Sequence, residues 1–89
     1  MWDWDEAKRA QTLSRRGLDF ALVRGFDLAS AMIEPDTRRD YGELRFRAFG
    51  VIDGRLHAIV FTPRHDRLRL ISLRRANERE RRRWLANDL

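Results

Sequence analysis

Arginine is the residue type in this sequence whose placement most directly suggests chemistry. Arg64, Arg69, Arg74 and Arg75 lie at or beside the ends of two expected neighbouring strands, where a sheet can bring several of them together. A planar guanidinium binds two phosphate oxygens at once and stays charged at neutral pH. We therefore interpret these four residues as a phosphate-binding set. The alternative is an ordinary solvated face that also contacts a protein partner.

The distribution of charge along the chain supports an anionic partner. The 89 residues carry 19 basic and 14 acidic side chains, a net charge of +5, and eighteen of the basic residues are arginine. Residues 1–54 have a net charge of −1, whereas residues 55–89 have ten basic and four acidic side chains, a net of +6. A polyanion that binds the second half is the first partner to test, unless the arginines only keep a small surface soluble.

Other chemistries are excluded or disfavoured by what the sequence lacks. Without cysteine there is no disulfide, zinc–thiolate site or thiol catalysis, and His57 and His65 alone make no convincing metal site. No phosphate-loop, dinucleotide-binding or hydrolase motif is present, so we expect no cofactor and no metal. No apolar run approaches the roughly 18 residues of a membrane span. We expect a cytoplasmic protein without a membrane partner.

Length and hydrophobic patterning predict one α+β domain over residues 1–89, in the order β-α-α-β-β-β-β-α. Asp5 is the expected N-cap of the first helix and Asp19 that of the second, while Asn77 and Glu80 form a capping box on the last. Trp84, Leu85 and Leu89 are its apolar anchors. The expected strands cover residues 2–4, 29–33, 43–52, 56–62 and 67–73, and the helices cover residues 5–16, 19–26 and 77–89.

Short connections between the later strands predict an antiparallel sheet of four to five strands. Asp53-Gly54 is a strong two-residue hairpin signal, and residues 63–66 are expected to turn the chain again. Arg67 and Arg69 alternate with leucines, so both should point from the same face of the sheet. Such a polar face is either a groove or interface, or an ordinary exposed face.

An ordered set of short motifs resembles one family. The chain resembles the BrnT toxins of type II toxin–antitoxin systems, a branch of the RelE-like ribonuclease fold. The motifs are Trp4-Asp5-Glu6-Ala7-Lys8, Gly17-Leu-Asp-Phe20, Gly42-Glu43-Leu44-Arg45-Phe46, Gly50, Thr62-Pro-Arg64, Arg69-Leu-Ile-Ser-Leu-Arg74-Arg75-Ala76 and Glu80-Arg81.

The resemblance implies a cytoplasmic ribonuclease held inactive by a BrnA-like antitoxin. Such antitoxins dimerise through a ribbon-helix-helix element that binds the operon's promoter, so promoter DNA is reached only through the antitoxin. The sequence also departs from the family. Arg16 stands where a histidine is usual, Phe61 where histidine or tyrosine is frequent, and Trp84 lacks the phenol that related toxins place near the scissile phosphate.

RNA cleavage needs no metal when the ribose 2′-hydroxyl is the nucleophile, provided the protein accepts its proton and stabilises the charged phosphorane. The resemblance places Glu43 where some RelE-like toxins have a catalytic glutamate, which makes it the candidate base. The alternative is an ion pair with a nearby arginine. The residues assigned to catalysis are Glu43, Arg64, Arg69 and Arg74, and those assigned to RNA binding are Arg45, Arg67 and Arg75.

Two other functions remain open at this point. The departures from the family leave open a catalytically degenerate module that binds RNA or an antitoxin without cleaving. The third candidate is a DNA-binding regulator that reads DNA with its Arg-rich last helix, although no helix-turn-helix spacing is recognisable.

Overall fold

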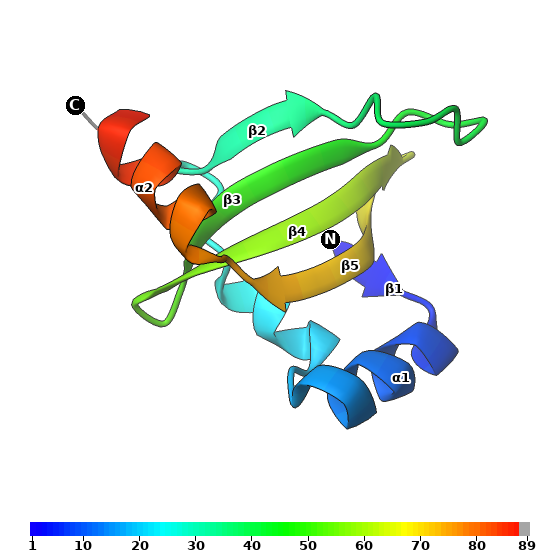
Figure 1. The fold of residues 1–89 in the computed structure, drawn as a ribbon. Helices are drawn as coiled ribbons and strands as arrows, with labels where there is room; N and C mark the ends of the chain where they lie inside the picture. The colour runs from blue at the N-terminus through cyan, green and yellow to red at the C-terminus, as the bar shows by residue number, and fades with distance from the viewer. Residues whose placement is uncertain (88–89) are drawn as a thin grey trace.

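A computed structural model describes residues 1–87 and confirms an α+β fold with one five-stranded sheet (Figure 1). The sheet order is β1-β5-β4-β3-β2. The elements are β1 (Trp2–Trp4), α1 (Glu6–Arg16), a 3₁₀ helix η1 (Phe20–Gly25), β2 (Met32–Pro35), β3 (Phe46–Ile52), β4 (Arg55–Arg64), β5 (Arg67–Arg75) and α2 (Glu78–Asn87).

The sheet is mixed rather than wholly antiparallel. Strands β2 to β5 form the expected antiparallel meander. The expectation is wrong for β1, which lies parallel to β5 with Trp2 opposite Leu68 and Trp4 opposite Leu70. The chain reaches β5 only after the whole meander, so no hairpin fixes the direction of this pair.

Three expected strand boundaries are also wrong. Asp27 accepts hydrogen bonds from the Ala29 amide and the Ser30 hydroxyl, which holds that segment in a turn and delays β2 to Met32. Strand β3 begins at Phe46, three residues after Glu43. Strand β4 continues through Pro63, which was expected to turn the chain. Pro63 lies beyond Phe61, the last residue that pairs with β3. Because proline has no N–H, it is tolerated here, where no hydrogen bond to β3 is required.

The core lies between the sheet and the N-terminal segment. Phe20, Val23 and Phe26, from η1 and the residue after it, pack against inward side chains of the strands such as Ile59 and Leu73. The expected second helix is a single 3₁₀ segment, and Asp19 caps it by accepting from the Ala21 amide. Helix α1 lies on this same side of the sheet (Figure 1) and contributes no buried residue.

Helix α2 crosses the opposite face of the sheet (Figure 1) and has no buried residue. The expected capping box is confirmed, because Asn77 and Glu80 each accept a hydrogen bond from the other's backbone amide. Leu85 is 49% exposed, so its prediction as an anchor is wrong, and Leu89 lies outside the described residues. Polar contacts of Glu80, Arg83 and Asn87 hold the helix on the sheet, and the expected anchor Trp84 is partly buried beside Met32. Neither helix of the described chain has the length and apolar character that crossing a bilayer requires.

Candidate nucleic-acid interface

The sheet face beneath α2 carries a row of arginines, and we call it the open face. Successive strand residues point to opposite faces, so the side chains between the core positions face this way. They include Arg47 and Phe49 of β3, Thr62 and Arg64 of β4, and Arg69, Ser72 and Arg74 of β5, with Arg45 directly before β3. The prediction that Arg67 and Arg69 share a face is confirmed by their cross-strand partners, Arg64 and Thr62.

At one end of the open face, Glu43 is paired with two arginines. Its carboxylate lies 3.1 Å from Arg45 Nε and 3.3 Å from Arg64 Nη2. The hydrogen bond from Arg45, and then the charges of both guanidiniums, hold the pKa of this carboxyl below its ordinary value. The ion pair considered as the alternative is therefore present. As placed, Glu43 is an ionised acceptor with weakened basicity.

Farther along the same face, three arginines surround a small hollow of about 80 Å³. We call this site the arginine hollow. Its polar walls are Arg38, Arg47, Arg74 and Ser72, and its floor is formed by Phe49 and residues 58–60 of β4. The charge of Arg38 disfavours that of Arg74, which is the repulsion expected where guanidiniums converge.

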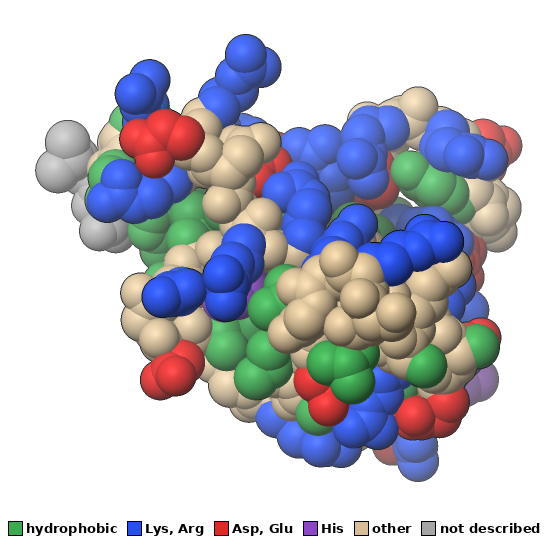
Figure 2. Space-filling model, turned by 60° about the horizontal axis from the view of Figure 1, so that its bottom comes forward, with side chains coloured by type: hydrophobic (Ala, Val, Ile, Leu, Met, Phe, Trp, Pro, Cys, Tyr) green, Lys and Arg blue, Asp and Glu red, His purple; other side chains and the backbone are tan. Residues whose placement is uncertain are grey.

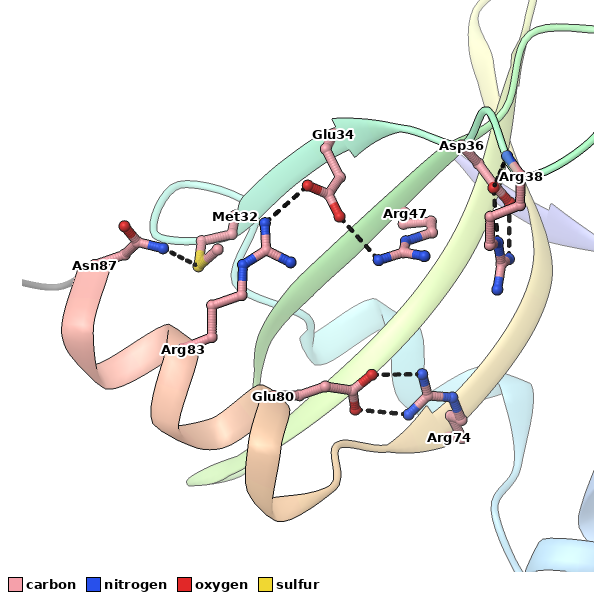
Figure 3. Close-up of polar contacts among 9 residues, drawn as sticks. All are labelled: Met32, Glu34, Asp36, Arg38, Arg47, Arg74, Glu80, Arg83 and Asn87. Carbon is pink, nitrogen blue, oxygen red and sulfur yellow. Dashed lines mark hydrogen bonds and ion pairs between the residues drawn. The ribbon is translucent and has the colours of Figure 1, made fainter.

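Two of these guanidiniums, those of Arg38 and Arg47, are held by carboxylates of β2 and of the loop that follows it (Figure 3). Asp36, whose side chain is 1% exposed, accepts two hydrogen bonds of 2.8 Å from Arg38. These bonds hold the pKa of the Asp36 carboxyl far below its usual range. Glu34 accepts from Arg47 at 2.9 Å. Both arginines are thus oriented before any ligand arrives.

Helix α2 supplies the third carboxylate. Glu80 accepts two parallel hydrogen bonds from Arg74, at 2.7 and 2.8 Å (Figure 3). This contact lowers the pKa of Glu80 and raises that of Arg74. Arg83 reaches back to Glu34 at 2.9 Å, and Asn87 donates to the sulfur of Met32. The polar contacts that hold α2 on the sheet therefore include one of the hollow's own guanidiniums.

The structure does not gather the predicted arginines at one point. Arg64 lies opposite Arg67 and Arg74 lies opposite Ala58, which is six residues away along β4. At roughly 3.4 Å per residue the two are about 20 Å apart along the strand. Arg69 pairs with Asp3 at 3.6 Å. Arg75 faces the core side, because it follows Arg74 directly in a strand.

Arg38 and Arg47 belong to the hollow but were not among the predicted site residues. Arg47 could have been identified from the sequence, because it alternates with Phe46 and Ala48 and so shares a face with Arg45. Arg38 lies in the loop between β2 and β3, where no periodicity reveals which way a side chain points. Figure 2 shows Lys and Arg side chains spread across the region between α2 and the far loop, with fewer acidic ones among them. Within residues 1–87 no group of three or more His, Asp or Glu could hold a metal ion.

These features define a basic α+β protein that presents positioned guanidiniums on one face of its sheet, an arrangement suited to anions with several oxygens. A family model described as "Ribonuclease toxin, BrnT, of type II toxin-antitoxin system" matches residues 4–80. The chain belongs to this family, as its motifs predicted. The match ends at Glu80, so Arg83 and the rest of α2 lie beyond it. No curated protein is similar enough to match the chain.

Proposed function

We propose that the chain is a metal-independent endoribonuclease toxin whose open face binds RNA. The observation that carries this proposal is the arginine hollow, where the side chains of Arg38, Arg47 and Arg74 converge on one face of the sheet. Each of the three arginines is oriented by a carboxylate, and guanidinium donors that converge in a fixed direction are suited to the oxygens of a polyanion. Membership of a ribonuclease toxin family makes RNA the expected polyanion.

The proposed path of the RNA backbone follows β3. Arg45, directly before β3, and Arg47 within it are two residues apart, about 7 Å in an extended chain, so they connect the Glu43 end to the arginine hollow. Arg74, with Arg47, binds the phosphodiester in the hollow. Arg64, Arg67 and Arg69 bind neighbouring phosphates at the β4–β5 end. Arg75 is the exception, because it faces the other side.

Glu43 is the proposed base that accepts the proton of the 2′-hydroxyl. Its pKa is low only while Arg45 and Arg64 donate to it. A phosphate that draws these guanidiniums away removes their stabilisation of the carboxylate, which raises its pKa and makes it a better proton acceptor. The base would therefore be activated by the substrate it acts on.

The test is cleavage of RNA by purified protein in EDTA. Arg47→Ala combined with Arg74→Ala should lower the cleavage rate at least a hundredfold, and Glu43→Gln should lower it without weakening RNA binding. Arg24→Ala is the matched control, since Arg24 lies over the Trp4 ring on the other side of the sheet. A folded double variant that cleaves like the wild type would overturn the assignment of the hollow.

The second candidate is a module that binds RNA or antitoxin without cleaving. It is favoured by Arg16, which donates to the Leu73 carbonyl at 2.8 Å and so has a structural role where the family commonly has a histidine. Binding without strand scission in the same assay would favour it. A DNA-reading role for α2 is less well supported, because this helix packs across the sheet through Glu80 and Arg83.

The partner, location and fold family belong to the same proposal. A BrnA-like ribbon-helix-helix antitoxin would neutralise the toxin by covering the open face, and promoter DNA would be bound only through that antitoxin. We propose further that residues 1–89 act as a single cytoplasmic domain without a cofactor. Its sheet would be a variant of the RelE-like ribonuclease fold, with one parallel strand added at the edge.

A further inference from the structure

A second hollow, of about 350 Å³, lies on the helical side of the sheet and is used by none of the steps above. It opens where the β3–β4 hairpin meets the start of η1. The lining residues are Leu18, Leu22, Ile52, Asp53, Arg55, His57 and Arg75, and we call the site the His57 pocket.

The imidazole of His57 is fixed in one tautomer. His57 is only 4% exposed, and its Nδ1 lies 2.8 Å from the Arg55 carbonyl oxygen. A carbonyl only accepts, so Nδ1 carries the hydrogen and, in the neutral ring, Nε2 is left as an acceptor. No residue among 1–87 donates a hydrogen bond to Nε2, yet this atom is not sealed from solvent. A buried acceptor is thus available to a ligand in the pocket.

Two guanidiniums at this pocket differ from those of the arginine hollow. Within the described chain, the side chains of Arg55 and Arg75 have no carboxylate or other polar partner, whereas Arg38, Arg47 and Arg74 all do. The acidic group of the pocket is Asp53, which lies in the hairpin turn, so the polar lining has a net positive charge. Unpaired guanidiniums beside a hollow are suited to a phosphate group.

The remaining wall is apolar. Leu18 and Ile52 are buried, and Leu22 is 41% exposed at the rim. A volume of this size is near the lower end of the range of about 300–1,000 Å³ typical of small-molecule sites. The pocket therefore suits a ligand that combines an anionic group, an apolar surface and an N–H or O–H donor.

We propose that the His57 pocket binds one nucleotide of an RNA chain. Arg55 and Arg75 bind its phosphate, the base packs against the leucines and Ile52, and an N–H or O–H of the nucleotide donates to His57 Nε2. A nucleotide is the unit of RNA that has all three features. This inference rests on the proposed function, since it extends the path of the same RNA.

The edge of β5 allows one RNA chain to reach both sites. Strand β1 covers β5 only from Leu68 to Leu70, so residues 71–75 have no strand on that side. Arg74 and Arg75 point to opposite faces at this edge, one toward each site. At this edge Arg16 donates to the Leu73 carbonyl, and with Lys8 and Arg15 it lines a further hollow of about 200 Å³ beside β5. The route around the edge is therefore basic.

The experiment is a titration of the full chain, labelled with ¹⁵N-histidine, followed by imidazole NMR. Each of the four nucleoside 5′-monophosphates is added at constant ionic strength, and inorganic phosphate is added as the comparison. We expect a saturable shift of His57 Nε2 with at least one nucleotide, and at least tenfold weaker binding for inorganic phosphate. Arg75→Ala should weaken nucleotide binding about tenfold, and Arg79→Ala on α2 should leave it unchanged.

Leu22→Glu keeps the proposal testable if Arg75→Ala does not fold, because it places a repelling charge at an exposed rim position. It should abolish the NMR shift of His57 on addition of nucleotide, while the spectrum remains that of a folded protein. No shift with any nucleotide, or an equal shift with inorganic phosphate alone, would overturn the proposal. The readout needs no cleavage, so an inactive protein that still binds nucleotides separates this inference from the proposed function.

Discussion

Replacing Glu80 by glutamine tests whether α2 competes with RNA for Arg74. The substitution keeps a side-chain oxygen that can accept from the Asn77 amide, since glutamine also completes a capping box. It removes the charge from a pair whose two N–O distances are 2.7 and 2.8 Å. Arg74 is then free to bind phosphate, so we expect weaker docking of α2 and stronger binding of RNA.

The expected loss of docking is modest. The side chains of Arg74 and Glu80 are 40% and 17% exposed, which places the pair between a surface ion pair and a buried one. Exposed pairs contribute about 0.2–1 kcal/mol, and the two-bonded geometry argues for the upper end, about 1 kcal/mol. Because α2 has no buried residue, this loss should appear as local opening of the helix rather than as global unfolding.

Amide hydrogen exchange measures that opening directly. A loss of about 1 kcal/mol corresponds to roughly fivefold faster exchange of α2 amides, while amides of β4 should be unchanged. The pKa of Glu80 is lowered in the folded state, chiefly by hydrogen bonds from Arg74. Its contribution is therefore fully present above the unfolded-state pKa, about 4.3, and is lost as pH falls through the lower folded-state pKa. The difference between the wild type and Glu80→Gln should shrink below about pH 4.3.

RNA binding supplies the functional readout. For a single strand, the slope of log K against log salt becomes more negative by about 0.7 for each phosphate contact. With one added contact, a fourfold rise in salt concentration should lower the RNA affinity of Glu80→Gln about 2.6-fold more than that of the wild type. Fluorescence anisotropy with a 2′-O-methyl RNA that cannot be cleaved measures this, with Arg74→Ala as the opposite control. Weaker RNA binding by folded Glu80→Gln would refute competition and make Glu80 a positioning residue for Arg74.

Three further substitutions test the packing around the site by urea denaturation. Gly50→Ala would place a Cβ 2.5 Å from Cζ of Phe26, so it should destabilise the fold by about 1–3 kcal/mol, and adding Phe26→Leu should restore part of the loss. Asp36→Asn removes the charge of a buried carboxylate whose partner, Arg38, is 57% exposed, so it should cost only about 1 kcal/mol at pH 7, and less as pH falls toward 3; equal losses at both values would contradict the pair. Thr62→Val removes a 2.6 Å bond from a 2% exposed hydroxyl to a backbone carbonyl and should cost about 1–3 kcal/mol; no loss would mean that the carbonyl finds another donor.

The elements of the fold were largely predictable because their signals are local. Asp5, Asp19 and the Asn77–Glu80 capping box each act within three residues, and each is observed at the expected helix end. The pairing of β1 was not predictable in the same way. A three-residue strand has no directional signal of its own, and its neighbour lies more than 60 residues later in the sequence.

The grouping of the arginines was harder to predict than the strands that carry them. Alternation correctly placed Arg67 and Arg69 on one face, but alternation says nothing of distance along a strand. Strand β5 is nine residues long, so its ends cannot contribute to one site. The same alternation separates Arg74 from Arg75, and neighbours in sequence thereby serve opposite faces of the sheet.

The uneven charge of the two halves of the chain was a misleading guide to where anions bind. The excess of basic residues lies after residue 54, yet Arg38 and Arg47 of the arginine hollow come from the first half, which has a net charge of −1. The acidic residues of that half do more than lower the net charge, because Glu34 and Asp36 orient these two guanidiniums. A carboxylate beside each arginine lowers the net charge of the face but fixes the direction of its N–H donors. At the arginine hollow, local pairing rather than the sum of charges therefore sets the direction from which a phosphate can be bound.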